Sequence, residues 1–453
     1  MKRLASILTI VFLYILALEV AVFSSSVQAQ TGTHVHEVHT APDRSFKESF
    51  KEIWTRDKLT GDWGGLRTDL HDHGIDIDLR LSQYYQNVAS GGVNQNGEYG
   101  GTMDYRVNAD GKKLFGLWEG LSFNMHARTR FGQDVGADAG SFALQNAGML
   151  MPRPGGYHGT NITGLTVSQY LPFFGGLANV TFGKLDIIDT LSGLFPWIDY
   201  GQDGFWNPNG MFPLLPWAGP LQGLSLFGGV AMTVNEKYQL PQSGFLIAGT
   251  ESVTTTWNFS DSFEEGVFMI GFQRFFWGDP NDKIGHFTIL GFGSTREQAS
   301  NERNDFIRIP GQGIVSTESK KPWGVSVLVY QEFWQAEGNP DRKANFVIGG
   351  GAGPDNPQVG EWTVFANIEA YGLMASRPAD RMGVSGWYES FSDNFQDLVS
   401  PVIALQDTWG AELYYNIAIN KWLRLTPDLQ LVMNERVADD IAVIPGVRLI
   451  MDF

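Results

Sequence analysis

The 453-residue sequence contains no cysteine, and only 18% of its residues are charged. The absence of cysteine excludes disulfide bonds, thiol catalysis and thiolate metal sites. The low charged fraction, together with 13% aromatic residues, excludes a coiled coil and a disordered chain. The fold therefore needs a large framework of backbone hydrogen bonds in place of covalent crosslinks.

Long apolar runs are absent everywhere except at the N-terminus. There, a basic start precedes an apolar stretch over residues 4–23, small residues follow at 24–26, and Val27-Gln28-Ala29 supplies a cleavage site. This pattern is typical of a secretory signal peptide, so we expect residues 1–29 to be removed. The alternative is an uncleaved membrane anchor, which Glu19 disfavours. No later segment has the roughly eighteen apolar residues that a spanning helix needs.

Positive charge is also scarce. The formal net charge is −17, and because residues 1–29 contribute +1, the remaining chain carries −18. Phosphate binding requires a basic surface. The charge balance therefore argues against nucleic acid as a partner.

From Ile75 onward, apolar and polar residues alternate with period two, as side chains do along a half-buried β-strand. The pattern is clear over 75–82 and recurs over 121–131, 412–419 and 423–433. The short connection at 420–421, between the last two of these runs, predicts a hairpin turn. One face of each run is apolar, and the other carries charged residues in mid-strand.

About sixteen such strands are expected once the less regular runs and the last strand are counted. The less regular runs lie near Met103, Gly164, Leu177, Leu224, Phe245, Thr254, Val267, His286, Trp323, Trp362 and Met382. A soluble antiparallel domain rarely needs so many strands, whereas a closed barrel in lipid pairs every backbone N–H and C=O. We therefore predict an all-β fold, a closed antiparallel transmembrane β-barrel of about 16 strands over 75–453. A secreted soluble β protein is the alternative.

The sequence ends on a strand pattern, V-R-L-I-M-D-F over Val447–Phe453. A strand at the end of a sheet needs a neighbour to pair its backbone groups. The arrangement resembles the closing strand of bacterial outer-membrane β-barrels, in which a terminal Phe is a common assembly signal. We expect this strand to close the barrel.

Residues 30–74 differ from the barrel region. Three histidines lie within His34–His39, but a loose tail supplies no supporting hydrogen bonds, so we expect only adventitious metal binding there. A short helix is expected over Ser45–Trp54, because one face collects its apolar residues. These residues are Phe46, Phe50, Ile53 and Trp54. That face either packs on the rim of the barrel or caps its lumen.

The stretch Leu59–Ile75, L-T-G-D-W-G-G-L-R-T-D-L-H-D-H-G-I, resembles the N-terminal signature of the carbohydrate-selective porin family (OprB-like). Phe182–Asp186, Arg377–Gly383 and Tyr414–Gln430 resemble further elements of that family. Leu185 departs from the pattern, because the family often has Phe there. The resemblance implies a sixteen-stranded outer-membrane barrel that passes small sugars by diffusion, with residues 30–74 on the periplasmic side. Locally, the glycines of this signature allow a tight turn into a helix that ends at Gly74.

The strand phase predicts which charges face the lumen, since an Arg on the lipid face near mid-membrane costs about 2–4 kcal/mol. Two interpretations stay open for each of these residues, an ion pair within the wall or a hydrogen bond to sugar hydroxyls. The predicted lumen residues are Arg80, Arg128, Arg130, Glu412, Arg424 and Asp428.

Aromatic residues gather in the long connection Ser192–Gly223. Pyranose rings have apolar C–H faces that pack on indole rings, so Trp197, Trp206 and Trp217 are candidates for a sugar-stacking surface. The alternative is a place in an interfacial aromatic girdle or in local packing.

The leading hypothesis is an outer-membrane porin in a Gram-negative-type bacterium that lets small carbohydrates diffuse passively into the periplasm. The alternative is a glycan-binding receptor or adhesin with a closed barrel. A lipid-acting enzyme is disfavoured, because Ser122 and His126 share the lumen face and no G-x-S-x-G elbow is present. We expect no cofactor and no metal. The expected partners are small carbohydrates and outer-membrane lipid, with the chain a monomer or a homotrimer.

Overall fold

The computed structural model describes residues 52–141, 145–150, 159–171, 177–199, 201–213, 215–217, 225–250, 261–311 and 313–453. The chain divides into two units, Met1–Phe50 and Lys51–Phe453, and all described residues belong to the second. The predicted signal peptide, the histidine stretch and most of the predicted helix at Ser45–Trp54 lie outside the described residues. Residues 52–55, at the end of that prediction, are helical.

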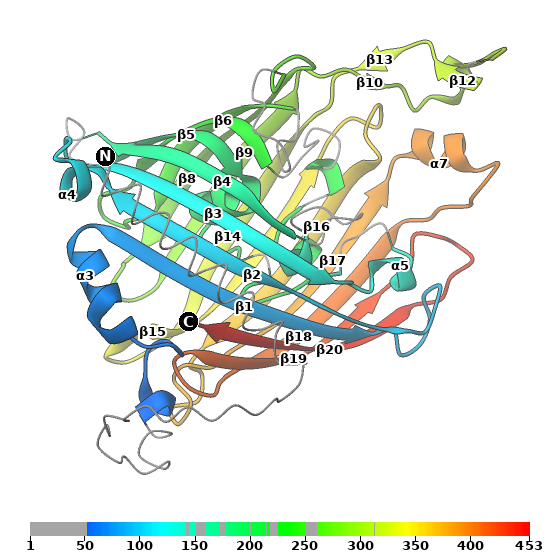
Figure 1. Ribbon diagram of the computed structural model, residues 1–453. Coiled ribbons are helices and arrows are strands. Elements are labelled where there is room, and N and C mark those ends of the chain that lie inside the picture. Colours follow the sequence, from blue (N-terminus) through cyan, green and yellow to red (C-terminus); the bar gives the residue numbers. More distant parts are fainter. Residues whose placement is uncertain are drawn as a thin grey trace, which may run out of the picture. The chain divides into compact units, whose positions relative to one another are not determined.

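Sixteen antiparallel strands of the described chain follow one another around a closed barrel (Figure 1). They are β1 (Ile75–Asn87), β2 (Gly97–Asp110), β3 (Leu121–Gly132), β4 (Gly159–Tyr170), β5 (Ala178–Asp186), β6 (Ser225–Val234), β7 (Pro241–Gly249), β8 (Val267–Gly278), β9 (Ile284–Ser294), β14 (Trp323–Ala336), β15 (Asn339–Ala352), β16 (Gly360–Tyr371), β17 (Arg381–Phe391), β18 (Thr408–Ala418), β19 (Leu423–Val432) and β20 (Ala442–Asp452). β20 pairs with β1 from Arg80↔Asp452 to Gln86↔Gly446. The predicted barrel is confirmed, and closure leaves its sheet without an edge.

The strand prediction missed one member of the barrel. β15 was not predicted, because Gly349, Gly350 and Gly351 have no side chains and the period-two signal disappears there. The strand that we expected near Thr254 lies outside the described residues. The hairpin expected at 420–421 is confirmed, and β18 and β19 flank it.

The connections at one end of the barrel are at most 10 residues long, whereas those at the other end reach 38 residues between β5 and β6. We call these the short-turn end and the long-loop end. The connections carry the small elements α4 (Gly111–Phe115), α5 (Gly136–Ala139), η2 (Ala147–Met149), β10 (Gln298–Ala299), η6 (Arg303–Asp305), β11 (Phe306–Ile309), β12 (Gly313–Ser316), β13 (Ser319–Lys320) and α7 (Asp393–Val399). Among the described residues, no helix is both long enough and apolar enough to cross a membrane.

The two faces of the barrel wall differ as the strand phase predicts. In β16, Val364 and Ile368 are about half exposed on the outer surface, whereas Asn367 and Glu369 are buried on the inner one. A water-soluble protein would show the opposite distribution. An apolar exterior around a polar interior is typical of a barrel that sits in lipid.

The N-terminal segment, residues 52–74, lies against the seam between β20 and β1. It contains η1 (Trp63–Gly65) and α3 (Leu66–Asp72), and α3 ends next to Gly74, whose φ of 89° is left-handed. The helix predicted from the glycine-rich signature is therefore present. The Leu59 N–H donates to the Asp452 carbonyl at 2.8 Å, which fastens the segment to the last strand.

Candidate functional site

Residues 187–199, 201–213 and 215–217, the described parts of the connection between β5 and β6, run inside the barrel, and we call this connection the inner loop. Its described parts contain α6 (Ile187–Leu194), η4 (Pro208–Gly210) and η5 (Leu215–Trp217). The Tyr84 hydroxyl of β1 donates to the Gly201 carbonyl at 3.1 Å, and the Trp217 indole N–H donates to the Ser326 hydroxyl of β14 at 3.2 Å. Contacts with both β1 and β14 are possible only from the interior.

Side chains of the wall hold both ends of α6. At its start, the Asp186 carboxylate accepts the backbone N–H groups of Ile188 and Asp189, which is an ordinary helix N-cap. At its end, the Arg274 guanidinium of β8 donates to the Leu194 carbonyl at 2.9 Å. A cation at this position also complements the negative end of the helix dipole.

An aromatic cluster fixes the far part of the inner loop. The Trp217 ring lies 4.3 Å from Phe292 and 4.8 Å from Phe212, measured between ring centroids, and Phe195 lies 5.3 Å from Phe272. All five rings are at least nine-tenths buried. Tight packing of this kind restrains the loop backbone, which carries the polar groups described next.

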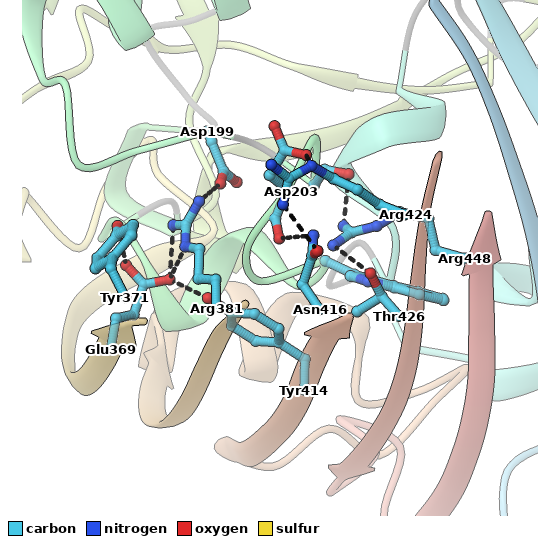
Figure 2. A network of polar contacts seen from close by, with 12 residues as sticks. Asp199, Asp203, Glu369, Tyr371, Arg381, Tyr414, Asn416, Arg424, Thr426 and Arg448 are labelled. Carbon is cyan, nitrogen blue, oxygen red and sulfur yellow. Dashed lines mark hydrogen bonds and ion pairs between the residues drawn. The ribbon is translucent and has the colours of Figure 1, made fainter. Parts of the chain in front are cut away.

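One polar cluster centres on Arg381 at the start of β17 (Figure 2). Its guanidinium contacts the Glu369 carboxylate of β16 at 2.7 Å and also pairs with Asp199 of the inner loop. Glu369 accepts further hydrogen bonds from the hydroxyls of Tyr371 and Tyr414. Arg381 therefore joins the barrel wall to the inner loop through two carboxylates.

A second cluster surrounds Asp203 of the inner loop (Figure 2). The Arg80 guanidinium of β1 lies 3.0 Å from one Asp203 oxygen, and Arg424 of β19 lies 3.9 Å from the other. Arg448 of β20 donates to the neighbouring Gly201 carbonyl at 2.8 Å. Arg80 also pairs with Asp452 at 2.7 Å. Cations from β1 and β19 thus contact one loop carboxylate, and a cation from β20 holds the loop backbone two residues earlier.

The charge state of Asp203 follows from this setting. Burial alone would raise the pKa of its carboxyl, but Arg80, Arg424 and Arg448 stabilise the ionised form and lower the pKa to about 2. Asp203 is therefore ionised at neutral pH. The loop stays electrostatically bound to the wall on both sides of the barrel seam.

Both clusters remain accessible from the lumen. The side chains of Arg80, Arg424 and Asp203 are 23%, 27% and 31% exposed, and Arg381 and Asp199 are also partly exposed. Guanidinium and carboxylate groups at the surface of a narrow passage can exchange hydrogen bonds with hydroxylated solutes. The arrangement supplies both donors and acceptors, and it contains no nucleophile paired with a base.

A third polar cluster lies at the base of α6. His126 of β3 contacts Asp104 at 2.7 Å through Nε2 and Asp189 through Nδ1, while Arg106 binds the other Asp189 oxygen at 3.1 Å. His126, Asp186 and Asp189 place ligand atoms within 4.8 Å of one another. Both imidazole nitrogens already have carboxylate partners. Arg106 and Arg128 supply positive charge to Asp189 and Asp104, so this cluster is best described as an ion network.

The predicted lumen residues fall into two groups in the structure. Arg80 and Arg424 lie together around Asp203. The other four are buried and engaged. Arg128 pairs with Asp104, Arg130 pairs with Asp134, Glu412 accepts two loop N–H groups, and Asp428 accepts from Gln430.

The three tryptophans proposed for sugar stacking all lie in the inner loop, but their rings are largely covered. Trp206 is 0% exposed and Trp217 is 1% exposed, and Trp197 packs between Arg274 and His286. Trp206 contacts Tyr84 edge-on, with ring centroids 5.4 Å apart. In this structure the rings of Trp206 and Trp217 hold the loop in place and present no free face to a solute, whereas Trp197 is partly exposed.

Sequence reasoning missed Arg381, Asp199, Asp203 and Arg448. In the last strand, Arg448 lies on the face opposite to that of the apolar Val447. The strand-phase argument that selected Arg424 therefore applies to Arg448 as well. Arg381 gives no such signal, because it begins β17 and is followed by Gly383 and Ser385. The two aspartates lie in a loop without periodicity.

The fold of this chain is similar to that of solved structures of OprB. The structure of OprB from Pseudomonas putida at high pH aligns with a TM-score of 0.69 and 18% identity, covering 88% of this chain and 99% of that chain. The low-pH structure of the same protein aligns with a TM-score of 0.53 and 16% identity over the same shares. These similarities show the fold. The comparison with curated protein sequences found no match to this chain.

A family model described as carbohydrate-selective porin, OprB family, matches residues 94–453. The matched region begins after Leu59–Ile75, so the resemblance of that N-terminal stretch to the family signature stays a prediction. Family and fold together point to a channel and not to an enzyme. This chain belongs to the OprB family of carbohydrate-selective porins.

Proposed function

We propose that the protein is an outer-membrane porin through which small carbohydrates diffuse passively into the periplasm. Solutes would pass between the inner loop and the wall that carries Arg80, Arg381 and Arg424. The observation that carries this proposal is the set of partly exposed charged groups that the inner loop and strands β1, β17 and β19 present to the lumen. The apolar outer surface of the barrel supports an outer-membrane location.

Sugar preference has a physical basis in these clusters. A sugar hydroxyl both donates and accepts hydrogen bonds, so it can bridge a guanidinium and a carboxylate that already lie close together. Each such contact replaces a contact that exists in the empty channel, so binding is weak. Weak, repeated binding is what conduction requires, because a solute must enter and also leave.

Planar-bilayer recording with sugar titration tests the proposal. We expect discrete conductance steps in salt and a concentration-dependent reduction of current by glucose, used here as the probe monosaccharide. Polyethylene glycol of similar hydrodynamic radius is the matched control, and it should reduce the current less at equal concentration. Steps without any difference between the two solutes would overturn sugar preference, and the absence of steps would overturn the channel.

The closed receptor is the second candidate, and liposome swelling separates it from a porin. Proteoliposomes in isotonic glucose should swell if the barrel conducts sugar. A closed receptor would admit no solute, although it could still bind glycans through its outer connections. The channel proposal also predicts that swelling slows as the size of the sugar increases.

A further inference from the structure

A cavity of about 450 Å³ lies at the short-turn end, apart from the clusters around the inner loop. The N-terminal segment forms one wall, with Lys58, Trp63 and Arg67. The first residues of β1 form the other, with Asp76 and Asp78. The volume is within the range of roughly 300–1,000 Å³ that small-molecule sites occupy.

The lining combines the two kinds of surface that a pyranose needs. Trp63 offers an aromatic ring for the C–H face of a sugar, while Asp76, Asp78 and Asn108 offer hydrogen-bonding groups for its hydroxyls. Lys58 and Arg67 add donors, and Leu70, Ile75 and Ile77 add apolar surface. The cavity therefore offers the mixture of apolar and hydrogen-bonding contacts that a pyranose requires.

The backbone at Trp63 is unusual, and it sets the position of the ring. Trp63 has a φ of 52°, and Gly64 and Gly65 follow with φ values of 72° and 98°. A positive φ is uncommon for a bulky residue and persists only where the surroundings enforce it. The indole N–H donates to the Thr60 hydroxyl at 2.9 Å, which restrains the ring further.

Arg67 links this ring to the barrel. Its guanidinium lies 4.3 Å from the centre of the Trp63 ring and covers one face, so only the opposite face can receive a sugar. The same group donates to the Gly61 carbonyl at 2.9 Å and to the Phe453 carbonyl at 2.7 Å. The aromatic wall of the cavity is thus tied to the last residue of the closing strand, and little ordering remains to be done when a solute binds.

The cavity continues the row of polar side chains that leads away from the inner loop. Asp76, Asp78 and Arg80 occupy alternate positions of β1 and point to the same face. Arg80 contacts Asp203 of the inner loop. Positions two apart on a strand are roughly 6.6 Å from each other, about the width of a pyranose ring. A solute that leaves Arg80 toward the short-turn end therefore meets Asp78 next.

The two carboxylates of the cavity are held by exposed partners. Lys58 pairs with Asp78 at 2.8 Å, and His71 pairs with Asp76 at 2.6 Å, and all four side chains are about one-third or more exposed. Exposed ion pairs contribute little net stability. Sugar hydroxyls can therefore replace one partner of each pair without disrupting the fold.

We propose that this cavity is a second binding site for a neutral monosaccharide, with Trp63 as its stacking surface and Asp78 as its main hydrogen-bond acceptor. The inference rests on the proposed function. The site would collect solute at the short-turn mouth and pass it to or from Arg80.

Trp63→Gly is the sharpest test, because glycine accepts a φ of 52°, so the backbone can stay in place while the ring and its contacts with Arg67 and Thr60 are lost. Glucose is added to one side of a bilayer at a time, and the on-rate of current block is measured from each side. In Trp63→Gly we expect the ratio of the short-turn on-rate to the long-loop on-rate to fall about 2- to 10-fold. Leu66→Ala is the matched control, since Leu66 is exposed in the same segment and does not line the cavity.

An unchanged ratio in Trp63→Gly would overturn the inference. Folding of each variant is checked by heat-modifiable migration on a gel. If Trp63→Gly does not fold, Asp78→Asn carries the same test, because it keeps the side-chain shape and removes the charge. A wild-type channel that conducts salt but shows no glucose block from either side would overturn the proposed function instead, so the two failures are distinguishable.

Discussion

The backbone N–H of Asn207 donates a 2.9 Å hydrogen bond to the carboxylate of Glu412, 205 positions further along the chain. The N–H of Trp206 donates to the same carboxylate. Glu412 is 1% exposed and projects from β18 into the lumen. One side chain of the wall therefore holds the middle of the inner loop.

Glu412→Gln should loosen the inner loop. The amide has a similar shape but accepts through one oxygen only, so one buried N–H loses its partner at a cost of about 1–3 kcal/mol. We expect larger fluctuations of the open-channel current and a lower free energy of unfolding. Glu119→Gln, at an exposed turn residue, is the control. Identical current noise in the two variants would contradict the role of Glu412 in holding the inner loop.

Arg381→Lys should weaken sugar block while leaving the barrel folded. A lysine ammonium cannot reproduce the planar fork that contacts Glu369 and Asp199 together. We expect the glucose concentration for half-maximal block to rise about 3- to 10-fold, which corresponds to about 0.7–1.4 kcal/mol. Arg303→Lys, at an exposed loop residue, should leave this concentration unchanged. An equal response of both variants would count against a role of Arg381 in sugar binding.

Acidification should release the inner loop near Asp203. The pKa of this carboxyl in the folded protein, about 2, lies below the usual value of about 3.9. The ion pairs with Arg80 and Arg424 are therefore complete above about pH 4 and are lost as the pH falls toward 2. Current noise recorded between these pH values should rise in the wild type. Asp203→Asn should be noisy already at neutral pH, and Asp279→Asn, on an exposed turn, should behave as the wild type.

His126→Ala should destabilise the barrel near the base of α6. The substitution leaves Asp104 and Asp189 without a shared buried partner, and breaking a buried ion pair typically costs about 3–5 kcal/mol. Denaturant unfolding followed by gel migration measures the change in the free energy of unfolding. His73→Ala, at an exposed residue, should change it by less than about 0.5 kcal/mol. A loss as small as that of the control would show that the His126 cluster contributes no net stability.

The strand phase was the most reliable guide from sequence to structure. It put Arg80 and Arg424 on the inner surface, and both lie beside Asp203. The inference works because the side-chain period of a strand is two, so a charged residue between apolar neighbours has only one face available to it. It failed for β15, where glycines remove the pattern.

The inner loop shows where sequence reasoning stopped. Its aromatic residues made Trp197, Trp206 and Trp217 candidates for a sugar-stacking surface. Composition does not distinguish a ring that faces solute from one that packs, and Trp206 and Trp217 proved to be buried. The contacts that decide this come from β1, β14 and β18, which are remote in sequence.

By itself, the sequence determined the closed barrel and the polar lining of its lumen, because both follow from local alternation and from the need to pair every backbone group in lipid. Only the tertiary structure decided which of the lining charges meet the inner loop. Arg80 and Asp203 are 123 positions apart, and Asn207 and Glu412 are 205 apart. Such pairs depend on the path of a loop through the interior, and the local pattern of residues does not indicate that path.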